Sequence, residues 1–367
     1  MIYLDHAATS PLREGVLEHM LPWLRAPGNP ASPHQAGQRA AIAVEDAREA
    51  IAALLGRTPE GIVFTSGATE ANHLWWNALP ILGVTRAATG QIEHPCVLAA
   101  AERFGERPDS SLVLLGADAS GQTLLPQDET IGALSLMAAN HETGVLQRLS
   151  EASSWCAQNG AILHVDATHT VGKAWIDFGG VHAVSASSHK LGGPGGVGVL
   201  SLNDGQPFPA MLTGGGQERG RRAGTIPTAA VVGMGAAARA ASRDLSEHLE
   251  VWRAAETAIT RVISELGGRR IGHPDHVIPC TILCAFPGLR GDTLVQSLDL
   301  SGFAVSAGAA CASGSLGPSE VLLAMGDPDP EGGVRISMGH STTMAEVEAF
   351  CLALREVTPK AQEASAW

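Results

Sequence analysis

Apolar and polar positions follow different periods in successive parts of the chain. Within the first 56 residues the apolar positions Ala40, Val44, Ala47, Ile51 and Leu54 recur every three or four residues. Such spacing predicts a helix with one buried face, which Ser32-Pro33 would cap and Gly56 would end. Short apolar runs of strand length then alternate with helical stretches, at 62–65, 112–115, 133–138, 162–165, 183–186 and 198–202. This alternation predicts an α/β fold with a mostly parallel sheet and helices on both faces.

The pattern changes in the C-terminal third. Residues 229–266 are helical in period and rich in alanine. Strand-like runs return at 281–286, 304–306 and 334–337, and a last helix is expected over 344–357. We expect a second, smaller α+β domain here, with a frayed tail at 359–367.

Composition narrows the class of protein. The chain has 367 residues, 45% of them hydrophobic and 17% charged, which is typical of a globular enzyme of about two domains. The net charge of −13 disfavours nonspecific nucleic-acid binding, despite the local cluster Arg219, Arg221 and Arg222. Neither a signal peptide nor an apolar run of membrane-spanning length is present in the sequence, so we expect a cytoplasmic protein without a membrane partner.

Six scattered cysteines indicate free thiols in a reducing compartment. Cys280 and Cys284 lie four apart on an expected strand, where core packing explains them better than metal binding. His273, Asp275 and His276 share a proline-containing loop without a fourth ligand nearby, and we expect no metal site.

Lys190 is the first candidate for chemistry. It follows the apolar run 181–184 and precedes a glycine-rich turn at 191–197. Burial disfavours the charged form of a lysine, which favours reaction of its amine with an aldehyde cofactor such as pyridoxal phosphate (PLP). The alternative is an ordinary surface lysine in a loop.

Two upstream segments favour the PLP interpretation. Asp166 ends the apolar run 161–165, and PLP needs a carboxylate against its pyridine nitrogen. The segment 62–70 predicts a strand, a glycine turn and a helix start, where backbone N–H groups and the Thr69 hydroxyl would hold a phosphate. Each alone has a structural alternative, a helix cap for Asp166 and a plain βα turn for 62–70. A phosphate site, a carboxylate and a lysine in this order are more specific than any one of them.

With these segments the chain resembles the cysteine desulfurases of the class V aminotransferase group, which are fold-type-I PLP enzymes. The resemblance covers nearly the whole chain, and the segments around Lys190 and Cys311 discriminate best. The matching segments are 3–9, 28–32, 65–70, 92–95, 139–144, 166–173, 187–190, 214–225, 306–315 and 335–339. It implies a large PLP-binding domain over 13–245, with 1–12 and 246–367 forming the small domain that carries the cysteine loop.

The resemblance also implies roles for individual residues. Lys190 matches the Schiff-base lysine, Asp166 the pyridine partner, and His94 the histidine that stacks on the cofactor and shuttles protons. Arg335 matches the arginine that binds the substrate carboxylate, a task suited to a planar guanidinium. The phosphate ligands would be Ala68, Thr69, Ser187, His189 and, donated by the neighbouring subunit of a homodimer, Thr225.

Cys311 is the candidate carrier of sulfur. Its neighbours are glycine, alanine and serine, so the loop has little to pack and would let one thiol visit both substrate and acceptor. The alternative of a buried structural cysteine fits poorly among such small residues. Cys96 lies two residues after His94, and packing is its expected role.

Two positions depart from the family. His169 stands where glutamine is usual, and His141 where asparagine is usual, both near the phenolic oxygen of the cofactor. Histidine can still donate a hydrogen bond there, so we expect both to bind PLP. As titratable rings, they would alter the pH dependence of the site.

The predicted activity is PLP-dependent desulfuration of L-cysteine, which yields alanine and a Cys311 persulfide for an acceptor protein in iron–sulfur cluster assembly or thiolation. One alternative is another PLP enzyme on this fold, such as a selenocysteine lyase or an aminotransferase. A different class is a non-catalytic sulfur-binding partner with a decayed site.

Overall fold

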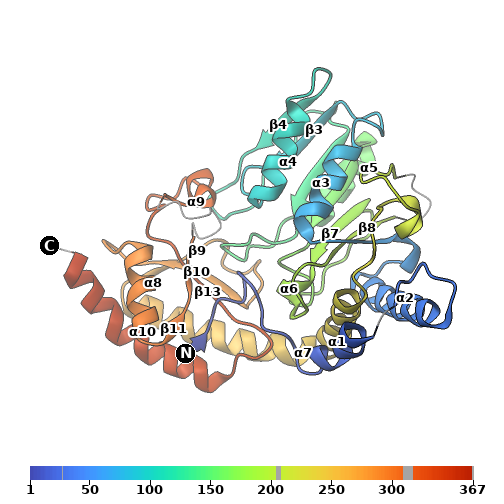
Figure 1. Cartoon of the computed structure of the whole chain (residues 1–367). Helices are drawn as coiled ribbons and strands as arrows, with labels where there is room; N and C mark the ends of the chain where they lie inside the picture. The colour runs from blue at the N-terminus through green and yellow to red at the C-terminus, as the bar shows by residue number, and fades with distance from the viewer. Residues whose placement is uncertain (27, 204–207, 309–316, 366–367) are drawn as a thin grey trace.

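A central sheet organises the chain, as the computed structural model shows for residues 1–26, 28–203, 208–308 and 317–365 (Figure 1). The strand order is β2-β8-β7-β6-β5-β3-β4. Strands β7, β6, β5, β3 and β4 are mutually parallel, whereas β8 is antiparallel to both β7 and β2. The strands are Ile62–Thr65 (β2), Arg86–Gly90 (β3), Ser111–Leu115 (β4), Ala133–Met137 (β5), Ile162–Asp166 (β6), Ala183–Ser187 (β7) and Gly198–Leu202 (β8). The predicted α/β class and mostly parallel sheet are confirmed.

Every apolar run predicted in this region is a strand, whereas β3 was missed. Its sequence, Arg-Ala-Ala-Thr-Gly, has one β-branched residue, Thr89, and none of the valine, isoleucine or aromatic residues that mark strands. It is buried between β5 and β4, so pairing on both sides places it in the sheet.

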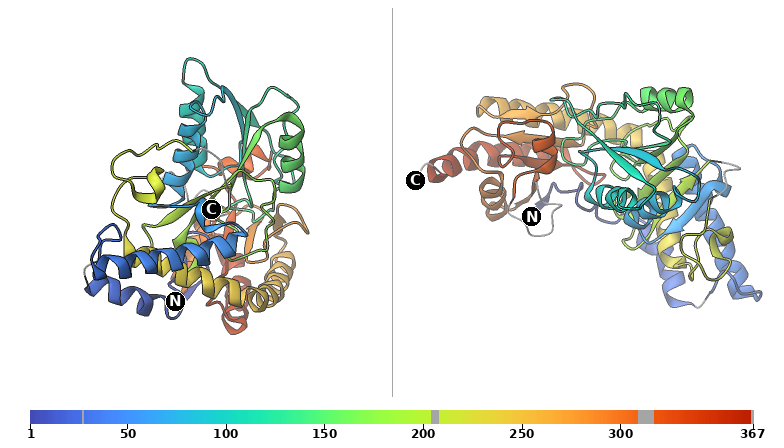
Figure 2. Two further views of the ribbon diagram at one scale, coloured as in Figure 1. Left: turned by 90° about the vertical axis from the view of Figure 1, so that its right-hand side faces the viewer. Right: turned by 90° about the horizontal axis from the view of Figure 1, so that it is seen from above.

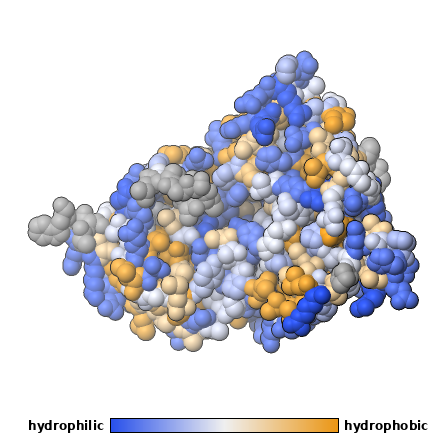
Figure 3. All heavy atoms as spheres, viewed as in Figure 1, coloured by the Kyte–Doolittle hydropathy of each residue, from blue (hydrophilic) through white to orange (hydrophobic). Residues whose placement is uncertain are grey.

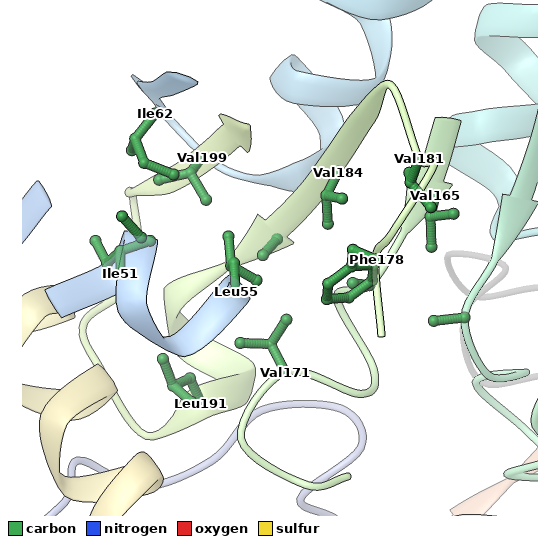
Figure 4. Close-up of a cluster of buried hydrophobic side chains, with 14 of the residues drawn as sticks. Ile51, Leu55, Ile62, Val165, Val171, Phe178, Val181, Val184, Leu191 and Val199 are labelled. Atoms are coloured by element: carbon green, nitrogen blue, oxygen red, sulfur yellow. The ribbon is translucent and has the colours of Figure 1, made fainter. Parts of the chain in front are cut away.

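Helices cover both faces of this sheet. On one face a core cluster joins α2 and α7 to the strands, and Figure 4 shows part of it gathered around Leu55, Val171 and Phe178. On the other face Trp75, Trp76 and Phe104 of α3 and α4 pack against the strands. The helices of this region are Val16–Arg25 (α1), Gln35–Leu55 (α2), Ala68–Ala78 (α3), Pro95–Gly105 (α4), Leu149–Asn159 (α5), Ser188–Leu191 (α6) and Thr228–Glu265 (α7), with 3-10 turns Pro59–Gly61 (η1) and Gln217–Gly220 (η2).

The C-terminal part has a sheet and a core of its own. An antiparallel sheet runs in the order β12-β13-β10-β9, and β1 pairs in parallel with β11. These elements are Ile2–Tyr3 (β1), Arg269–Ile271 (β9), Thr281–Ala285 (β10), Phe303–Ala304 (β11), Ser306–Ala307 (β12), Val334–Ser337 (β13), Gly291–Leu300 (α8), Glu320–Ala324 (α9) and Met344–Ser365 (α10).

Helix α7 runs along both parts of the molecule (Figures 1 and 2). Ala241 belongs to the core beneath the large sheet, and Leu245 to the core of the C-terminal part. The N-terminal Leu4 also joins the C-terminal core. The proposed division into domains at residues 12 and 245 stays a prediction.

Local details correct three expectations. The N-cap of α2 is His34, whose Nδ1 accepts a hydrogen bond from the Gly37 amide at 3.3 Å, and not Ser32. The run 304–306 is divided between β11 and β12. The tail is not frayed up to Ser365, since α10 continues through Pro359 and Ala361 is buried. Packing of the buried face of α10 outweighs the loss of the one backbone hydrogen bond that Pro359 cannot donate.

Candidate functional site

A cavity of about 310 Å³ lies at the carboxyl ends of β5, β6 and β7, the edge where α/β sheets bind ligands. The volume falls within the range of small-molecule sites. Residues from six separate segments meet there, because parallel strands deliver the residues that follow them to one edge. The lining includes the predicted site residues Ala68, Thr69, His94, His141, Asp166, His169, Ser187, His189 and Lys190.

One end of the cavity suits an anion. The N-terminus of α3 opens into it with Gly67, Ala68 and Thr69, and such an end presents unpaired backbone N–H groups. The backbone of β8 packs closely behind this turn: a Cβ on Gly198 would lie 2.7 Å from the Gly67 Cα. Because Gly198 has no side chain, β8 can pack directly against the turn at Gly67. Ser187 lies on the cavity wall near this turn.

Asp166 is held at the end of β6 by two donors. The Asn72 side-chain amide donates to Oδ2 at 2.8 Å, and the Thr168 backbone N–H donates to Oδ1 at 2.9 Å. Asp166 is buried, so its carboxylate faces the cavity with little competition from water. The role of Asn72 was not predicted from the sequence. The signal for it was a polar amide among the apolar residues that follow the expected helix start at 66–70.

Lys190 lies on the short helix α6, three residues beyond the end of β7 rather than on the strand itself. Its Nζ donates to the Ala7 carbonyl, and the Ser10 hydroxyl donates to the Lys190 carbonyl at 3.3 Å. The N-terminal segment therefore packs against α6.

His94 is the N-cap of α4, and its ring meets that of His141 edge to face at a centroid distance of 5.3 Å. Burial lowers the pKa of His94, and the charges of Lys190 and Arg335 lower it further, although Asp166 opposes this. His94 is therefore neutral around pH 7.

The two departures from the family, His141 and His169, are both buried. Burial lowers the pKa of each well below 6.5, and nearby cations, including Lys190 and Arg335, add to the effect. His169 Nε2 lies 3.1 Å from the Thr281 hydroxyl. The Nδ1 atoms of both rings have no hydrogen-bond partner within the described ranges. Both rings are neutral near pH 7 and can serve a ligand oxygen as hydrogen-bond donors.

Two of the predicted site residues, Arg335 and Thr225, do not line the cavity, and a third, Cys311, lies outside the described residues. Arg335 on β13 is 1% exposed and does not line the cavity: it donates to Asp5 Oδ1 at 3.0 Å and to the His141 carbonyl at 3.1 Å. Thr225 is exposed and does not line the cavity of its own chain.

The residues present fit PLP. The α3 N-terminus, Thr69 and Ser187 suit its phosphate, the buried Asp166 suits its pyridine nitrogen, and Lys190 suits its aldehyde. The unpartnered Nδ1 atoms of His141 and His169 supply buried polar groups that a ligand oxygen would satisfy.

Known proteins resemble this chain along its whole length. The family described as "Aminotransferase class-V" matches residues 2–350. An IscS-like cysteine desulfurase of Mycobacterium tuberculosis is 34% identical, with 100% of this chain and 98% of that protein covered. Cysteine desulfurase IscS of Neisseria meningitidis is 36% identical, with 99% and 94% covered.

Solved structures agree. A NifS-like protein superposes with a TM-score of 0.91 at 31% identity, covering 98% of this chain and 99% of the other. A structure described as SspA in complex with cysteine has a TM-score of 0.81 at 30% identity, covering 92% and 99%.

Proposed function

Because this chain belongs to the class-V aminotransferase family, we propose that it is a PLP-dependent L-cysteine desulfurase. It is similar over its full length to proteins named cysteine desulfurase, and the family resemblance read from its motifs is confirmed. The predicted cofactor is confirmed as well, since enzymes of this family and fold depend on PLP.

The observation that carries the proposal is the convergence of Lys190, Asp166 and the α3 N-terminus on one cavity. These three features are separated in sequence and perform three different tasks for one cofactor. A decayed site would not keep the buried carboxylate hydrogen-bonded by Asn72 at 2.8 Å, because a buried charge is costly without such a function.

The residues would divide the work as follows. Bound PLP supplies an electron sink for the Cα carbanion of the amino acid. Asp166 holds the pyridine nitrogen protonated, while the Lys190 amine takes the proton from Cα. Arg335 orients the substrate carboxylate, and this requires its guanidinium to share or leave its ion pair with Asp5.

The Cys311 thiolate would attack the substrate sulfur. A sulfur–sulfur bond forms and the Cβ–S bond breaks, with its electron pair remaining on the carbon fragment, which is protonated and leaves as L-alanine. L-cysteine and a thiol thus become alanine and a Cys311 persulfide, with atoms and electrons balanced.

Partners complete the proposal. Thr225 would reach the phosphate of a neighbouring subunit in a homodimer, which agrees with its exposed position away from its own cavity. Apolar side chains available for such contact include Leu17, 46% exposed, and Trp175, 63% exposed. Figure 3 shows apolar patches among hydrophilic surface on one face of the molecule. The persulfide would pass to an acceptor protein for iron–sulfur cluster assembly or thiolation.

Cytoplasmic location stays a prediction. Among the described residues, no helix combines the length and the apolar character that crossing a bilayer requires.

The test uses PLP-loaded protein, L-cysteine and a thiol reductant, with alanine and sulfide measured together. We expect equal amounts of both, no sulfide from Cys311→Ser, and normal turnover by Cys156→Ser, whose thiol is buried in α5 outside the cavity. Turnover by Cys311→Ser at the wild-type rate would indicate an aminotransferase or lyase instead. No turnover by the wild type would favour a non-catalytic sulfur-binding role.

A further inference from the structure

A second thiol, Cys96, lies in the wall of the cavity. It stands in the first turn of α4, directly after the N-cap His94 and Pro95. Packing alone was expected of it. It does pack against the apolar core beside α3 and α4. Its Sγ also lies among polar side chains at the N-terminal ends of these helices.

These contacts form a continuous chain from Asp166 to His94. The Asn72 Nδ2 donates to Asp166 Oδ2 at 2.8 Å and to Cys96 Sγ at 3.3 Å, so both of its hydrogens are used. Cys96 Sγ in turn lies 3.0 Å from His94 Nδ1. The Thr69 hydroxyl also hydrogen-bonds the sulfur.

The direction of each hydrogen bond follows from the donors available. A carboxylate only accepts, so the amide nitrogen of Asn72 must face Asp166, and its second hydrogen points to the sulfur. The Cys96 backbone N–H donates to His94 Nδ1 at 3.2 Å, so this nitrogen carries no proton. The thiol hydrogen of Cys96 then has an acceptor at Nδ1.

We propose that the Cys96 side chain, held by Asn72, is a positioning group: its thiol shares the Nδ1 of His94 with the Cys96 backbone N–H and so stabilises the neutral tautomer that carries its proton on Nε2. Burial raises the pKa of the Cys96 thiol to about 11, which agrees with a thiol that keeps its hydrogen. His94 thereby becomes a proton donor through Nε2 rather than a base at Nδ1. The inference rests on the proposed function for the use of that proton.

Other charged or titratable groups also face His94. They come from the loop after β5, from β6, from α6 and from β13, and are His141, Asp166, His189, Lys190 and Arg335. None of these changes when Cys96 is replaced, so a comparison of Cys96 variants isolates the thiol.

The experiment measures the tautomer and pKa of His94 by ¹⁵N NMR of histidine-labelled, PLP-loaded protein without L-cysteine, with the signal assigned from a His94→Asn variant. The variants are Cys96→Ala, which removes the thiol; Cys96→Val, which fills its space without a donor; and Cys96→Ser, which restores a donor. Cys156→Ala is the control.

In the wild type we expect an unprotonated Nδ1. In Cys96→Ala and Cys96→Val the His94 pKa should rise by about 0.7 units, a roughly fivefold change in its protonation equilibrium, from loss of one hydrogen bond. Cys96→Ser should match the wild type, as should the control.

Three results would overturn the proposal: a protonated Nδ1 in the wild type, an unchanged pKa in the alanine and valine variants, or a serine variant that behaves like alanine. This readout does not use turnover, so a failure of the desulfurase assay would leave it interpretable.

Discussion

Glu142 offers a quantitative test of the electrostatics around the site. It is 4% exposed, its Oε2 accepts a hydrogen bond from the Ser319 hydroxyl at 2.6 Å, and its Oε1 lies 3.9 Å from His141 Nε2. Burial raises the pKa of Glu142 from 4.5 to about 7, and Glu320 adds to the rise, while Ser319 and the charge of Arg335 oppose it. The folded protein therefore binds this proton more tightly than the unfolded chain does.

The sign of the effect on stability follows. Between pH 4.5 and 7 the folded state holds more protons at Glu142, so its contribution to the free energy of unfolding falls as pH rises. With a shift of this size the loss is about 1 kcal/mol at pH 5 and about 3 kcal/mol at pH 8. Glu142→Gln keeps the shape and cannot ionise, so relative to the wild type it should gain about 2 to 3 kcal/mol between pH 5 and pH 8.

Urea unfolding of both proteins at pH 5, 6, 7 and 8 measures this difference directly. Glu102→Gln, an exposed position on α4, is the matched control and should show no such trend. A difference between Glu142→Gln and the wild type that stays constant with pH, or that falls as pH rises, would refute the reasoning.

The remaining predictions concern the site. Lys190→Ala should lose the visible absorption of the lysine-bound cofactor, and reduction with borohydride should attach the cofactor to Lys190 in the wild type; label on another lysine would contradict the assignment. Arg335→Lys should raise the KM for L-cysteine about 10-fold or more, because a point charge cannot hold a carboxylate bidentately; an unchanged KM would exclude Arg335 from substrate binding. Mixing Lys190→Ala chains with Thr225→Ala chains should restore activity, since a heterodimer would contain one intact composite site; confirmed heterodimers without activity would contradict site sharing.

Much of the catalytic chemistry could be predicted from residues that belong to local motifs. Lys190, Asp166 and the turn at 66–70 each follow an apolar run, and a run that becomes a parallel strand places its next residues at one edge of the sheet. The class of fold follows from the same alternation, whereas the order of strands is a result of the tertiary structure. The missed strand β3 shows the limit, because its five residues carry no apolar run and owe their conformation to their neighbours.

Only the tertiary structure decided how these groups are charged and supported. His141 and His169 look titratable in the sequence, yet burial keeps them neutral. Asn72 reaches Asp166 across 94 positions, and Arg335 pairs with Asp5 across 330. Motifs specify which chemical groups are present, because the chemical identity of a side chain depends only on its own residue. Desolvation and hydrogen bonding depend on what lies within a few ångströms, and in this fold those neighbours come from distant segments of the chain.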